Sequence, residues 1–178
     1  MTFNEFIIRS NSNYTFLKKF AKRSKSLCGI ELSDLTHLRY KTLKRTVPEL
    51  FNSEHYELAL YEILKDTKKN VTFGKVKRAD NFKKYAFLLW VQDQYEVIKN
   101  LEQTYLSSPP DMKLLNAGIR DLDVLGDVSL IDNLAGGDIL KWDLIIELPY
   151  SKIFDKQLKN TIEHRISKKM NENNKSKP

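Results

Sequence analysis

The aspartates of this sequence come nearest to a catalytic arrangement. They cluster in the second half of the chain, at Asp121, Asp123, Asp127, Asp132, Asp138 and Asp143. Catalysis by paired carboxyl groups requires two of them to converge in an apolar cleft with separated pKa values, and this spacing does not impose convergence. Helix caps and a solvated acidic face account for the cluster. We therefore expect no enzymatic activity, and a site built on Asp121 and Asp127 is kept as the catalytic alternative.

Motifs for metal ligation, nucleophilic catalysis and cofactor binding are lacking. The three histidines, His37, His55 and His164, are far apart, and no Cys-x-x-Cys, His-Glu-x-x-His or phosphate-binding glycine loop occurs. Cys28 is the single cysteine, so it cannot close an intramolecular disulfide, which is typical of a reducing cytosol. It falls on the apolar side of a predicted helix, where we expect a small core residue. We expect neither a metal nor another cofactor.

A basic helix face is the third candidate site. Residues 13–28 show an amphipathic pattern that ends at Gly29. Its polar side carries Lys18, Lys19, Lys22, Arg23 and Lys25. These cations could contact nucleic-acid phosphates with an affinity that falls as salt rises, could bind an acidic protein, or could face water. The residues alone leave the three alternatives open.

The first half of the chain is predicted to continue with two helices and a loop. One helix runs from a Ser33 cap and ends before Pro48, and the next begins at Ser53. The apolar face of the helix after Ser53 comprises Tyr56, Ala59, Leu60, Ile63 and Leu64. Residues 67–79 carry five basic side chains and are expected to form a basic loop.

The strongest helical pattern begins at an Asp80 cap and continues to Tyr105. A helix over 111–125 is expected to follow, with Gly118 on its apolar side where another backbone approaches closely. Asp138 is the expected cap of a short helix that buries Ile139, Trp142, Ile145 and Ile146. Ser151 is expected to cap a last helix.

Composition predicts a single domain with an apolar core. The 178 residues are 41% hydrophobic and 11% aromatic. We expect a mainly α fold over 1–168, with a basic N-terminal part (1–79), a helical core (80–168) and a mobile tail (169–178). The longest apolar run has six residues, at 86–91, whereas a membrane span needs about twenty. The N-terminus lacks a basic leader, so we expect no secretory signal.

The net charge of +7 is unevenly distributed. Residues 1–79 hold 16 basic and 8 acidic side chains, residues 80–150 hold 6 and 12, and residues 151–178 hold 8 and 3. Blocks of opposite sign suit a protein whose copies contact one another in a fixed order. Uneven but solvated surfaces are the alternative.

Residues 80–168 resemble a known class of virion proteins. The similarity lies in FLLWVQDQYE at 87–96, Leu101-Glu102, AGIRDL at 117–122, DNLAGGDILKWD at 132–143 and LPYSKIF at 148–154. This pattern is similar to that of small proteins of the structural gene cluster of crAss-like tailed bacteriophages. Within that class it most resembles a neck protein, one of the rings that join the portal to the tail.

The resemblance implies a structural role. It implies a helical subunit without catalysis, repeated around the portal axis in a homo-oligomeric ring, typically twelve-fold. Its partners would be the portal, other neck and tail proteins and DNA in the channel, in the virion and, during assembly, in the host cytoplasm. We expect Asp138, Trp142 and Tyr150 to contact neighbouring subunits. A small nucleic-acid-binding accessory protein that uses the basic helix is the competing function.

Overall fold

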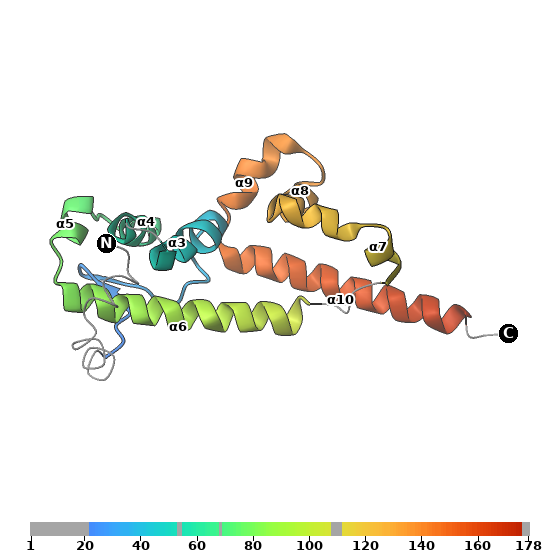
Figure 1. Cartoon of the computed structure of the whole chain (residues 1–178), viewed down its shortest axis with the longest axis horizontal. Helices are drawn as coiled ribbons and strands as arrows, with labels where there is room; N and C mark the ends of the chain where they lie inside the picture. The colour runs from blue at the N-terminus through green and yellow to red at the C-terminus, as the bar shows by residue number, and fades with distance from the viewer. Residues whose placement is uncertain (1–21, 53–54, 68, 108–111, 176–178) are drawn as a thin grey trace. The chain divides into compact units, whose positions relative to one another are not determined.

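The computed structural model describes residues 22–52, 55–67, 69–107 and 112–175 (Figure 1). Over these ranges the chain is mainly α-helical, as predicted. Its contacts divide it into two compact units, Met1–Lys99 (unit 1) and Asn100–Pro178 (unit 2). Within the described ranges, no helix has the length and apolarity that crossing a membrane requires.

Unit 1 contains a short hairpin and a series of helices. In chain order its elements are β1 (Ser26–Leu27), β2 (Ile30–Glu31), the π-helical η1 (Thr42–Thr46), α3 (Val47–Asn52), α4 (Tyr56–Asp66), α5 (Phe73–Lys77) and α6 (Asn81–Tyr105), whose last turns belong to unit 2. The helices α3 and α4 pack together, and α4 also packs on α5. Of the 24 buried hydrophobic side chains in the described residues, 20 lie in unit 1.

The predicted helix over 13–28 is wrong over its described part. Residues 22–25 are not helical, and β1 pairs with β2 in an antiparallel hairpin in which Leu27 faces Ile30. Cys28 and Gly29 form the two-residue turn, with φ of 56° and 78°. Positive φ at both positions is what a type I′ hairpin turn requires. Gly29 thus serves a turn instead of a helix end, and Cys28 is half-buried rather than a core residue.

The second predicted helix begins later and ends later than expected. Helical structure starts at Tyr40, and residues 33–38 form turns in which Asp34 accepts hydrogen bonds from the amide and hydroxyl of Thr36. The helix then continues through Pro48. Just before this proline, the Val47 amide donates to the Thr42 carbonyl, which is the i→i−5 hydrogen bond of a π turn. This wider turn gives room to the proline ring, which would otherwise press on a preceding carbonyl.

The next helices agree better with the sequence. The face of α4 that was predicted to be apolar is buried at Ala59, Leu60, Ile63 and Leu64. The expected basic loop over 67–79 instead contains α5, capped by the Thr72 hydroxyl, which accepts from the Lys75 amide. α6 has the predicted length, and the Asp80 carboxylate accepts from the Lys83 amide at 3.0 Å.

Unit 2 consists of short helices followed by one long helix. After the end of α6, its elements are α7 (Met112–Asn116), the 3₁₀ segment η2 (Ile119–Leu125), α8 (Val128–Ala135), the 3₁₀ turn η3 (Ile139–Lys141), α9 (Trp142–Ile146) and α10 (Tyr150–Lys175). The helix predicted over 111–125 is interrupted at Gly118, where φ is 86°, because that left-handed conformation ends a helix. η2 has no buried residue. The core expected within 80–168 therefore does not include this segment.

The end of the chain is more helical than expected. Asp138 caps η3 as predicted, accepting from the Leu140 amide at 3.1 Å, but Ile139 is exposed. α10 begins at Tyr150 and extends to Lys175, so the segment predicted as a mobile tail is helical up to that residue. Arg165 of α10 donates to the carbonyls of Tyr105, the last residue of α6, and of Ser107, which follows that helix.

Candidate functional site: a basic cleft and an exposed acidic segment

The predicted basic helix face is not present as such. Lys18 and Lys19 lie outside the described residues, and Lys22, Arg23 and Lys25 lie on an extended segment. Arg23 pairs with Asp93 of α6, and this contact raises the pKa of the guanidinium. Lys25 pairs with Glu31 at 2.6 Å, and its hydrogen bond lowers the pKa of that carboxyl. Two of the five cations are thus already partnered within the chain.

A different set of cations lines a cleft of about 750 Å³ in unit 1. Lys22 comes from the segment before β1, Lys75 and Arg78 come from α5 and the residue that ends it, and Lys83 comes from the first turn of α6. We call this site the basic cleft; its other walls include the hairpin turn and the Phe82 ring. Sequence analysis missed it because its members come from three separate elements.

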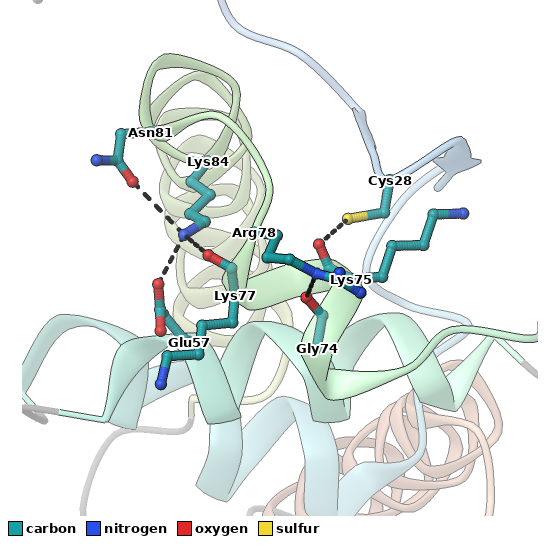
Figure 2. A network of polar contacts seen from close by, with 8 residues as sticks. All are labelled: Cys28, Glu57, Gly74, Lys75, Lys77, Arg78, Asn81 and Lys84. Atoms are coloured by element: carbon teal, nitrogen blue, oxygen red, sulfur yellow. Dashed lines mark hydrogen bonds and ion pairs between the residues drawn. The ribbon is translucent and has the colours of Figure 1, made fainter.

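Local contacts hold the walls of the basic cleft in place. The Cys28 thiol lies 3.7 Å from the Lys75 carbonyl, which ties the hairpin turn to α5 (Figure 2). Arg78 donates from Nε to the Gly74 carbonyl at 3.1 Å. The amide of Ser24 donates to the Ala86 carbonyl of α6 at 3.1 Å. Hairpin, α5 and α6 are therefore joined around the cleft.

The basic cleft has an excess of positive charge. Among the described residues, Lys22, Lys75 and Lys83 have no ion-pair partner. Asp80 is the one carboxylate in the lining, and it is engaged as the cap of α6. The N-terminus of a long helix adds a partial positive charge at the same place. The cleft is thus suited to an anionic group.

A buried lysine fixes the elements behind the cleft. Lys84 is 2% exposed, and its ammonium group donates to Glu57 Oε1 at 2.6 Å and to the Lys77 carbonyl at 2.8 Å (Figure 2). Asn81 Oδ1 lies 3.5 Å away and completes the set. Because an ammonium group has three donors, Lys84 is satisfied while it connects α4, α5 and α6.

Unit 2 presents an unusual number of exposed apolar side chains. Those more than one-third exposed are Leu101, Tyr105, Met112, Ile119, Leu122, Val124, Leu125, Ile139, Leu140, Leu144, Ile162, Ile166 and Met170. Val124 and Leu140 are the extremes, at 87% and 85%. In contrast, the buried hydrophobic side chains of unit 2 are Ile131, Ala135, Tyr150 and Ile153, counting the described residues only.

The aspartates of unit 2 have different local contacts. Asp132 accepts a hydrogen bond from Trp142 Nε1 at 3.1 Å, and Asp138 pairs with Lys141 at 3.0 Å. Asp121 and Asp123 are exposed on η2. In the described ranges, no three potential ligands come close enough to hold a metal ion.

Two of the three expected interface residues, Tyr150 and Trp142, make side-chain hydrogen bonds within unit 2. Tyr150 is 2% exposed and donates its hydroxyl to Glu102 Oε1 at 2.5 Å. Trp142 is half-buried and bonded as described above. Leu140, two residues before Trp142, is 85% exposed. The helical pattern did not include it in the predicted buried side.

No match exists to place the chain in a family. Comparisons with family models, with curated proteins and with solved structures each returned nothing. The basic cleft of unit 1 and the exposed apolar side chains of unit 2 are therefore the features that bear on function.

Proposed function

We propose that this chain is a structural protein of a tailed bacteriophage virion. In this role it is a ring subunit of the neck, joins the portal to the tail and assembles as a closed oligomer. The sequence pattern of residues 80–168 suggests the family. The exposed apolar side chains of unit 2 are the observation that carries the proposal.

Soluble monomers rarely leave many large apolar side chains unburied in one part of the fold. Of the large apolar side chains that are exposed among the described residues, 13 lie in unit 2 and 4 in unit 1. Such an excess is typical of a surface that another protein covers. Since η2, η3 and α9 all contact α8, their exposed side chains are displayed around one helix. Subunits packed side by side in a ring would bury them.

The charge distribution supports contacts between different surfaces of identical copies. The basic cleft lies in unit 1, whereas η2 carries two exposed aspartates and one arginine. Contact between two unlike surfaces of the same chain generates a ring when the rotation closes. Opposite charges also fix the register of such a contact. No catalytic step belongs to this role, and the portal and neighbouring neck proteins are its expected partners.

The test is the mass and shape of the purified 20.9 kDa chain, alone and mixed with its cognate portal oligomer. We expect light scattering and negative-stain images to show closed rings at low salt, or rings on the portal where the free chain is monomeric. A V124S/L140S variant should lose the rings, and L58S, which removes an exposed leucine of unit 1, should keep them. Monomers in every condition, with and without the portal, would contradict the proposal.

Nucleic-acid binding is the second candidate, and the basic cleft is the observation that favours it. Three lysines without ion-pair partners in the described residues could contact phosphates, while the exposed Phe82 could stack on a base. This function predicts salt-sensitive binding of a labelled oligonucleotide by the isolated chain, weakened several-fold by K75A/K83A. Binding that is absent or indifferent to salt would remove this candidate.

A further inference from the structure

We propose that the basic cleft of unit 1 receives the η2 segment of a second copy of this chain. The inference deepens the proposed function and rests on it, because it names the two surfaces that meet when subunits assemble. Two properties favour η2 as the occupant of the cleft: its charge is opposite to that of the cleft, and its side chains are exposed.

The basic cleft offers unpaired cations beside apolar walls. Lys22, Lys75 and Lys83 are exposed and have no ion-pair partner among the described residues. Leu27 and the half-exposed Phe82 line the same cleft. Its partner should therefore carry carboxylates next to an aliphatic side chain.

The η2 segment has that composition. Asp121 and Asp123 are exposed, and no described residue bonds to either carboxylate. Val124 follows them directly and is 87% exposed. Of the aspartates nearby, Asp132 bonds to Trp142 and Asp138 pairs with Lys141. Asp143 is also exposed, but it is a single carboxylate, whereas η2 presents two. η2 thus combines free carboxylates with an unburied aliphatic group.

The contact would be strong only where both surfaces lose water. Exposed ion pairs contribute little to the free energy of binding, so the charges set the orientation of the contact, while burial of Val124 against apolar walls supplies most of the affinity. Screening by salt should weaken the contact. Because cleft and η2 are different surfaces, each copy can give one and receive one, which is the heterologous arrangement of a ring.

Cys28 makes the contact testable, because the single thiol of the chain lines the basic cleft. The native chain is mixed with a tagged C28S/V124C variant and oxidised mildly at low salt. A disulfide requires Cα atoms within about 7 Å, so we expect a mixed dimer of one native and one tagged chain. The matched control is C28S/V97C, which places a thiol at an exposed valine of α6. Equal yields for V124C and V97C would overturn the proposal.

Charge-reversal variants distinguish this specific contact from non-specific association. K75E/K83E in the native-cysteine partner should reduce the mixed dimer at least several-fold, and D121K/D123K added to C28S/V124C should do the same. Combining the two reversed partners should restore the yield. Failure of the combination to restore it, with circular dichroism showing folded chains, would refute the docking. If K75E/K83E does not fold, K22E replaces it, because Lys22 lies on an extended segment.

The outcomes distinguish this docking from the proposed function. Rings that survive K75E/K83E unchanged would overturn the docking and leave the ring function intact. Mixed dimers without rings, with or without the portal, would support the docking and contradict the ring function. Loss of oligonucleotide binding in K75E/K83E with undiminished cross-linking would assign the cleft to nucleic acid and also overturn the docking.

Discussion

Replacement of Lys84 by methionine tests the buried network most directly. Methionine has a similar length and no charge, so the change removes the ammonium group with little change in packing. It leaves the Glu57 carboxylate without its cation and the Lys77 carbonyl without its donor. We expect a folded but markedly less stable protein.

The size of the loss follows from the burial of the partners. Removing one member of a buried ion pair costs about 3–5 kcal/mol. The Glu57 side chain keeps 25% exposure, so water replaces part of the lost interaction and we expect about 3 kcal/mol. In K84M/E57L the unpaired carboxylate is gone and only the orphaned carbonyl remains, at a cost of about 1–3 kcal/mol. The double variant should therefore be more stable than K84M.

Urea unfolding followed by circular dichroism at pH 7 measures these differences. The matched control is K83M, one residue away on the same helix, where the lysine is exposed and has no ion-pair partner among the described residues. Its free energy of unfolding should stay within about 0.5 kcal/mol of the native value. The reasoning would be refuted by a K84M chain as stable as K83M, or by a double variant less stable than K84M.

Three further substitutions have defined expectations. Cys28→Asn should raise the free energy of unfolding by about 0.5 kcal/mol, and with it the melting temperature, because asparagine tolerates the positive φ of this turn better. A lower melting temperature would contradict the turn assignment. Burial acts to raise the pKa of Asp34, but the hydrogen bonds it accepts outweigh burial and the pKa is lowered. The native chain should therefore be more stable than Asp34→Asn above about pH 4, and urea titrations should show this advantage fade as the pH falls further; a constant difference from pH 7 to pH 3 would refute the assignment. Tyr150→Phe should lower the free energy of unfolding, measured by thermal unfolding, by about 1.5–3 kcal/mol, because the hydroxyl bonds to a carboxylate. An unchanged melting curve would show that the Glu102 contact does not contribute to stability.

Sequence periodicity predicted those elements whose own residues determine them. α6 begins after its predicted cap and α4 buries its predicted face, because each is long enough to show a helical repeat and has one buried side. The cap at Asp138 was also predictable, since a carboxylate after two glycines has few other local roles.

The remaining elements depend on contacts or backbone details that a helical repeat does not express. Leu27 and Ile30 fit a helix stripe and a hairpin equally well, and the positive φ of Cys28 and Gly29 decides for the hairpin. Pro48 is a helix breaker by propensity, yet a π turn accommodates it. The basic cleft could not be predicted, because its cations are separated by up to 61 positions, from Lys22 to Lys83, and only the fold brings them together.

Sparse burial makes the stability of unit 2 depend on its surroundings. A segment that buries few apolar side chains gains little free energy from folding, so its backbone opens at low cost. In the proposed ring, second copies that cover the exposed leucines would bind only the folded form, and mass action would then add stability as concentration rises. Amide hydrogens of α8 should exchange with solvent more slowly in a concentrated sample than in a dilute one. Those of α4, inside the packed core of unit 1, should exchange equally in both. Under the ring proposal, the thermodynamic ground state of this half of the chain would be a property of the assembly and not of the isolated polypeptide.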